Sequence, residues 1–393
     1  MDNTSVKNGS AAPVMKQFVT KDIPPNSFFT KPVYVNKKLL LMAPEMPFTL
    51  VMKKILEEWE FNDIYSTGTM SGSYSTETGS GAEDEEDLAN ATGDGDGLAK
   101  AREFYDNFSK YVDRLFTKVV LGSELEFNII AKDMKSVCEF IREERRFLLR
   151  VQKDVAVDAG ENYITPHSVK TTIIAIIIGS YLKLPNHKLI ELGVAAMLHD
   201  VGMLKLPSRI YLSKETLGQK ELEAIVNHPL MGYNLLKSFD FPLAVTLAAL
   251  EHHERENGLG YPRKITGERI SLYSKIISVA CSYEALSSKR PYKEAKDGYT
   301  GMVELLKNED KQYDDTAIRA LVFSLSIYPI GLYVLLSSGQ KGQVVDVNPG
   351  NPRYPMVQVF GEINPDGKNK VFETSKDGLA IVRPLTNGGI NKS

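Results

Sequence analysis

The segment Met197-Leu-His-Asp-Val-Gly202 places a histidine and an aspartate side by side in an apolar run near the middle of the chain. The chain has only six histidines, and most of them lie close to this pair in the sequence. His167 precedes the pair, and His228, His252 and His253 follow it. Imidazole nitrogens and carboxylate oxygens suit borderline divalent ions such as iron, manganese, zinc and cobalt, so this clustering predicts a metal site.

The number of candidate ligands indicates two ions rather than one. A single ion takes three or four protein ligands. The set here has six members, namely His167, His199, Asp200, His228, His252 and His253. Because a carboxylate has two oxygens, we expect Asp200 to bridge the two ions. A pair of ions about 3.5–4 Å apart can hold both the attacking and the leaving oxygen of a phosphate ester.

The order and spacing of these motifs resemble the HD-GYP family, a branch of the HD phosphohydrolases that hydrolyses cyclic di-GMP. The resemblance covers residues 150–328. It rests on the first segment and on three later ones, Asn227-His-Pro-Leu-Met-Gly232, His252-His-Glu-Arg-Glu-Asn-Gly-Leu-Gly-Tyr-Pro262 and Ala285-Leu-Ser-Ser-Lys-Arg-Pro-Tyr292. It implies a mainly α protein with an all-α HD-type helical bundle, acting as a metal-dependent phosphodiesterase on cyclic di-GMP or a related cyclic dinucleotide.

The resemblance also implies how the ligands divide. One ion would be held by His167, His199 and Asp200, and the other by His228, His252 and His253, with Asp200 as the bridge. His199 and Asp200 would be the catalytic pair. The expected cofactors are two divalent transition metals, with iron or manganese favoured and zinc as the alternative.

The substrate would be recognised by a second set of residues. The net charge of −3 gives no positive field that would attract long nucleic acids, so a small anionic ligand needs local cations. By the resemblance, Arg290 and Lys293 contact the substrate phosphates, and Gly260, Tyr261 and Pro262 of the signature loop shape the pocket.

Three positions depart from the family pattern. Cys281 stands where the family has an aspartate that completes the first metal site. It either ligates the metal as a thiolate, which suits zinc or iron, or is a small buried residue that leaves the metal to water. Met203 replaces a lysine near the scissile phosphate, and Tyr163 replaces a glutamate of members with three metals. We therefore expect two ions, and an active hydrolase. The alternatives are a degenerate member that senses cyclic dinucleotides without turnover, and an unrelated phosphohydrolase.

The flanking sequence predicts further parts around the bundle. A Gly/Ser-rich stretch with the acidic run Glu83-Asp-Glu-Glu-Asp87 has almost nothing apolar to bury, which is typical of a disordered linker. Short β-type runs separated by glycine, proline and asparagine follow the bundle. The predicted parts are a small α+β unit (1–65), this linker (66–98), a helical connector (99–152), the HD-GYP domain (153–328) and a β-rich appendage and tail (329–393).

The amino-acid composition indicates the class of protein and where in the cell it is expected. Hydrophobic residues make up 42% and charged residues 25%, as in ordinary soluble globular proteins. Two cysteines, Cys138 and Cys281, are too few for a disulfide framework. Residues 1–16 lack the apolar core of a signal peptide, and the apolar run 171–179 is too short to span a bilayer. We expect a cytoplasmic protein. A protein partner at the N-terminal unit and a homodimer stay open.

Overall fold

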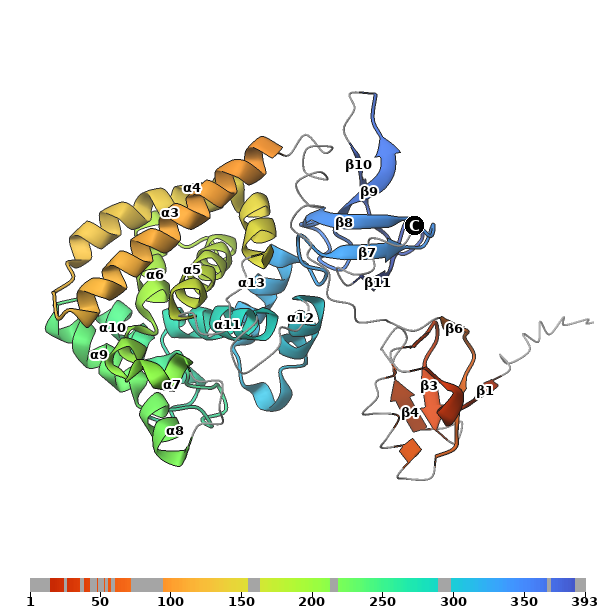
Figure 1. The fold of residues 1–393 in the computed structure, drawn as a ribbon, viewed down its shortest axis with the longest axis horizontal. Helices are drawn as coiled ribbons and strands as arrows, with labels where there is room; N and C mark the ends of the chain where they lie inside the picture. The colour runs from red at the N-terminus through yellow and green to blue at the C-terminus, as the bar shows by residue number, and fades with distance from the viewer. Residues whose placement is uncertain are drawn as a thin grey trace, which may run out of the picture. The chain divides into compact units, whose positions relative to one another are not determined.

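The computed structural model divides into two compact units, one within residues 1–79 and one within residues 80–390. Each unit is described by itself, with the labels of Figure 1. The described residues are 15–24, 27–35, 39–42, 48, 53, 56–57, 61–71, 95–154, 163–212, 218–288, 298–365 and 369–385.

The N-terminal unit contains a small antiparallel sheet. Its strands pair in the order β1 (Lys16–Val19), β5 (Asp63–Ser66), β3 (Val33–Val35) and β4 (Leu39–Met42), and β2 (Phe28–Phe29) pairs separately with β6 (Met70–Ser71). A one-turn helix, η1 (Thr20–Asp22), follows β1. Phe29, Phe48 and Ile64 are fully buried in its own small core. Strands β3 and β4 pair antiparallel, with Val35 opposite Leu39.

Regular structure extends into both ends of the range that the sequence predicts as a linker. Strand β6 lies at its beginning, and helix α3 (Gly95–Val120) begins before its end. Residues 72–94, including the acidic run, lie outside the described residues.

The second unit is built around α5 (Ile164–Tyr181), whose middle is buried on every side because it carries the apolar run 171–179. Such a helix needs neighbours all round. They are α3, α4 (Phe127–Asp154), α6 (Asn186–Leu198), α11 (Leu272–Ser287) and α13 (Asp315–Leu325). In the part of the chain that the structure describes, no helix is both long and apolar enough to cross a membrane.

Shorter helices complete this body. They are η2 (Val201–Lys205), α7 (Ser208–Leu212), α8 (Gln219–Val226), α9 (His228–Ser238), α10 (Leu243–Glu251), η3 (Gly267–Arg269), α12 (Gly298–Lys307) and η4 (Glu309–Lys311). α9 contacts both η2 and α10, and α10 contacts α6 and α11. These contacts bring α6, η2, α9 and α10 together, and residues from each of the helices α6, α9 and α10 or their ends belong to the candidate site.

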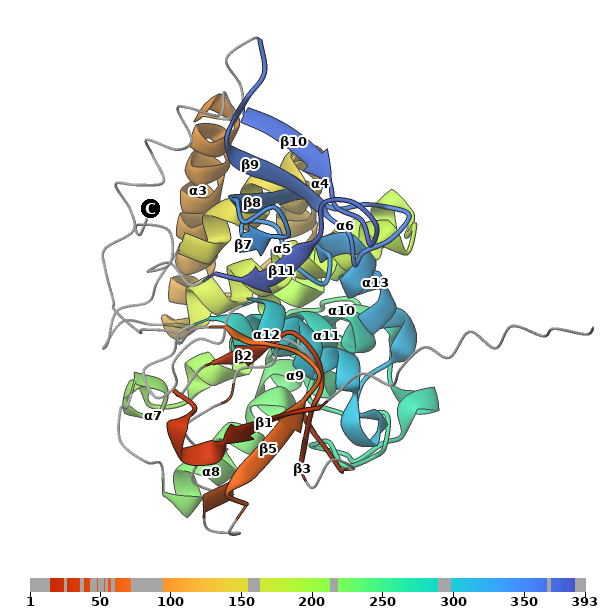
Figure 2. The ribbon, with the colours of Figure 1, turned by 90° about the vertical axis from the view of Figure 1, so that its right-hand side faces the viewer.

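The chain after the bundle forms an antiparallel sheet. Its strand order is β10 (Asn369–Glu373), β9 (Met356–Ile363), β8 (Lys341–Asp346), β7 (Tyr333–Leu336) and β11 (Ile381–Pro384). Val334, Val344 and Val357 of its inner face join the apolar core of the helices. The strands lie at one end of the helical body (Figure 1, Figure 2). The predicted fold class, a helical bundle with a small N-terminal unit and a C-terminal β appendage, is confirmed.

Candidate metal centre

The predicted ligands come from five separate helical elements and their ends. His167 lies in the first turn of α5, and His228 is the first residue of α9. The pair His199-Asp200 follows α6, His252-His253 follows α10, and Cys281 lies within α11. The structure brings these seven residues into two groups in which all ligand atoms lie within 4.8 Å of one another. The groups are Asp200, His228, His252 and His253, and His167, His199 and Cys281.

The two oxygens of Asp200 face different sets of histidines. Oδ1 lies 3.1 Å from Nε2 of His228 and 3.3 Å from Nε2 of His252. Oδ2 lies 3.5 Å from Nε2 of His167 and 3.7 Å from Nε2 of His199. Asp200 thus stands between the two groups with one oxygen toward each, as a bridging carboxylate does.

Backbone carbonyls fix the orientation of three imidazole rings. Each ring donates its Nδ1–H to the carbonyl three residues earlier, at 2.7 Å for His199, 2.5 Å for His228 and 3.0 Å for His252. With the proton on Nδ1, the lone pair of Nε2 points into the cluster. Nε2 of His199 is buried and has no hydrogen-bond partner among the described residues. A buried nitrogen in this state fits a metal ligand.

His167 differs from the other ligands because its Nδ1 is hydrogen-bonded to the carboxylate of Glu284, which is also buried. Burial alone would lower the pKa of His167, but the charges of Glu284 and Cys281 outweigh it and raise the pKa to about 10. Sequence reasoning missed Glu284. Glu284 could have been found from its spacing of three residues from Cys281, because that spacing places both side chains on one face of α11.

The protonation states of the other ligands also favour binding of a cation. Burial lowers the pKa of His199 to about 3 and also lowers the pKa of His252 and of His253, so these rings are neutral at pH 7. Burial would raise the pKa of Asp200, but the neighbouring His199, His228 and His252 hold it well below its usual range. Neutral imidazoles around an ionised carboxylate are the protonation states that metal binding requires.

A close backbone approach sets the position of His228. A Cβ atom on Gly202 would lie 2.0 Å from the carbonyl oxygen of His228 and 2.7 Å from the backbone nitrogen of Gly232. No other residue fits between η2 and α9 without moving one of them. Gly202 of the first motif therefore brings His228 against Asp200.

The signature loop lies directly beside the group of ligands that contains His253. The ring of Tyr261 stacks on that of His253, with centroids 4.6 Å apart and planes 21° from parallel. A Cβ atom on Gly260 would lie 2.5 Å from the carbonyl oxygen of His253, so this loop passes too close for any side chain there. Pro262 follows through a cis peptide bond. The loop is thus packed tightly against His253.

Glu254 holds this loop in place from the inside. Its carboxylate accepts hydrogen bonds from the backbone nitrogens of Arg263, at 2.7 Å, and Ile265, at 3.2 Å. The side chain is 1% exposed, so the two bonds are shielded from water. Sequence reasoning gave Glu254 no role. Its position directly after the two histidines was the available signal.

Of the remaining positions named from the sequence, two lie outside the described residues and two lie within them. Arg290 and Lys293 lie outside the described residues. Met203 is buried in the apolar core, so the position after the first motif offers no cation. Tyr163 precedes α5, and its carbonyl accepts the backbone N–H of His167 at 3.0 Å.

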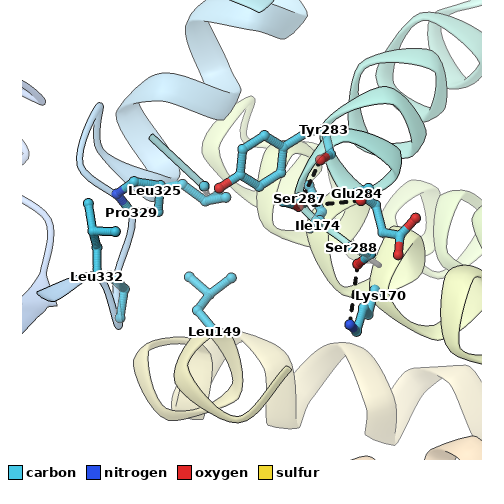
Figure 3. Close-up of a pocket in the computed structure, with 12 residues that line it drawn as sticks. Leu149, Lys170, Ile174, Tyr283, Glu284, Ser287, Ser288, Leu325, Pro329 and Leu332 are labelled. Carbon is cyan, nitrogen blue, oxygen red and sulfur yellow. Dashed lines mark hydrogen bonds between the residues drawn. The ribbon is translucent and has the colours of Figure 1, made fainter. Parts of the chain in front are cut away.

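Glu284 also borders a pocket of about 80 Å³ where α5, α11 and the start of the C-terminal sheet meet (Figure 3). Leu325, Pro329 and Leu332 form its apolar side. Its polar side includes Lys170, which donates a hydrogen bond to Ser288 Oγ at 3.3 Å. Glu284 thus lines this pocket and also contacts His167 of the candidate metal centre.

Comparison with known proteins identifies the domain that carries the cluster. Residues 150–317 match the HD domain family. The chain is 32% identical over 231 residues to the cyclic di-GMP phosphodiesterase PdeB of Borreliella burgdorferi. These residues are 59% of this chain and 60% of that protein. The candidate ligands therefore all lie in a segment that matches an HD domain. HD domains are metal-dependent, and the two groups of ligands could hold metal ions.

Two further relatives are also named for the cyclic dinucleotides on which they act. The cyclic di-GMP phosphodiesterase PA4108 of Pseudomonas aeruginosa is 31% identical over 207 residues, which are 52% of this chain and 50% of that protein. The 3′3′-cGAMP-specific phosphodiesterase 3 of Vibrio cholerae is 30% identical over 173 residues, 44% of this chain and 38% of that protein. The chain thus spans less than two thirds of the length of these relatives.

Proposed function

We propose that this chain is an HD-GYP protein that hydrolyses a phosphodiester bond of a cyclic dinucleotide at a centre of two divalent metal ions. The observation that carries the proposal is Asp200, whose two oxygens face separate groups of buried ligand atoms. Cyclic di-GMP is the first substrate to consider, because two of the relatives are named for it. The relative named for 3′3′-cGAMP makes a mixed cyclic dinucleotide the alternative.

The donor set fits the proposed ions. One would be held by His167, His199 and Cys281 and the other by His228, His252 and His253, with Asp200 between them. Iron or manganese is expected, with zinc as the alternative. When bound, two such ions polarise the phosphate as Lewis acids and make water a nucleophile at neutral pH.

The chain's own groups orient these ligands and the substrate. The carbonyl partners of the Nδ1 atoms hold the rings in place, and Asp200 stays ionised between them. We propose that the stacked ring of Tyr261 forms a wall for the dinucleotide. Arg290 and Lys293 are proposed to neutralise its phosphates, since charge-assisted hydrogen bonds to phosphate are the stronger kind.

The test is metal analysis followed by turnover. Protein purified without oxygen should contain about two metal ions per chain and should consume cyclic di-GMP or 3′3′-cGAMP. His252→Ala should lose one ion and the turnover, because it removes a ligand 3.3 Å from Asp200 Oδ1. The matched control is His187→Ala, which removes an exposed histidine outside the cluster and should change neither quantity.

A sensor without turnover is the second candidate, and the burial of Met203 favours it. A cation at that position would stabilise charge on the reacting phosphate, and Met203 supplies none. A sensor binds the dinucleotide stoichiometrically and returns it unchanged with manganese, iron or zinc. That result would refute hydrolysis and establish the sensor.

A further inference from the structure

We propose that the two metal positions differ in kind, and that the one at Cys281 is a thiolate site that selects a soft ion such as zinc. The other position offers only nitrogen and oxygen ligands. This inference rests on the binuclear centre of the proposed function and assigns the sulfur a specific place in it.

The distance from Cys281 to its neighbour fits two ligands of one ion. Sγ of Cys281 lies 3.5 Å from Nε2 of His167. Zinc bonds of about 2.3 Å to sulfur and about 2.0–2.1 Å to nitrogen, at a tetrahedral angle, place the two ligand atoms about 3.5 Å apart. In the other group, Nε2 of His228 and Nε2 of His252 are 3.3 Å apart, and two zinc–nitrogen bonds predict about 3.3 Å. Both groups therefore have the spacing of ligands around a single ion.

The second cysteine of the chain shows what a core cysteine looks like here. Cys138 belongs to the apolar core, its sulfur faces the backbone carbonyl of Leu189, and burial raises the pKa of its thiol to about 12. Cys281 is also buried but stands apart from that core cluster, with its sulfur against an imidazole nitrogen. The interpretation of Cys281 as a simple packing residue is disfavoured by this difference.

The charge around the Cys281 group strengthens its preference for a soft cation. His167 is hydrogen-bonded to the carboxylate of Glu284, whereas His228 and His252 donate to neutral carbonyls. A carboxylate partner raises the basicity of a ligand imidazole. A thiolate next to such an imidazole makes a donor set that favours zinc, iron or cobalt over manganese.

Cobalt(II) is the probe, because a cobalt–thiolate bond gives an intense near-ultraviolet charge-transfer band that nitrogen and oxygen ligands do not give. Full-length protein stripped of metal is titrated with cobalt(II) without oxygen. The band should saturate at about one equivalent, while total binding reaches about two. Zinc should remove the band at one equivalent, and a matching amount of manganese should leave it.

Variants test whether Cys281 gives rise to the cobalt charge-transfer band. Cys281→Ser should abolish the band and lose one ion, and Cys281→Asp should bind two ions without the band. His253→Ala is the matched control, since it should lose the other ion and keep the band. Two cobalt ions bound to the unaltered protein without a band would overturn the thiolate site and leave the binuclear proposal standing. Failure to bind any cobalt would overturn both.

Discussion

Glu284→Gln tests whether the carboxylate behind His167 tunes the metal centre. The substitution keeps the size of the side chain and removes its charge, while both partners are 3% exposed and therefore shielded from solvent. A hydrogen bond to a charged group contributes about 1.5–3 kcal/mol, and one between neutral groups about 0.5–1.5 kcal/mol. The difference of about 1–1.5 kcal/mol predicts roughly 5- to 15-fold weaker binding of the ion at His167.

The assay is a competition titration of zinc against a chelator, with the cobalt charge-transfer band as a second measure of the same position. Glu254→Gln is the matched control, because it makes the same change at another buried carboxylate. Glu254 is bonded to two backbone nitrogens of the signature loop and to no ligand imidazole in the described part of the chain. It should lower stability and leave affinity at His167 unchanged. Equal affinities in Glu284→Gln and the unaltered protein would refute the reasoning.

Three further predictions follow from the geometry. Asp200→Ala should empty both metal positions, because each carboxylate oxygen faces one group, and elemental analysis that still finds two ions would reject the bridge. Gly202→Ala should cost about 1–3 kcal/mol of unfolding free energy in denaturant titrations, since its Cβ would lie 2.0 Å from the carbonyl oxygen of His228. An unchanged midpoint would contradict that packing. Tyr261→Ala should weaken binding of cyclic di-GMP about 2- to 10-fold by calorimetry, from about 0.5–1.5 kcal/mol of ring stacking, whereas Tyr261→Phe should keep it.

Several elements and the types of ligand could be predicted from the amino-acid sequence. The apolar run at 171–179 has no charged face, so a helix that carries it must be enclosed by others, as α5 is. The short apolar runs after residue 331 predicted strands, and they form the C-terminal sheet. Because histidine and aspartate carry their ligand chemistry wherever they stand, the motifs at His199, His228 and His252 could be recognised without coordinates.

Only the tertiary structure decided how these groups are arranged. The division of the Asp200 oxygens between two sets of histidines, the contact of Cys281 with His167, and the carboxylate of Glu284 behind that ring all join residues far apart in the chain. Periodicity reports which face of a helix is apolar, but not which distant side chain lies against it. That contact depends on how the helices pack, and packing is set by the whole core at once.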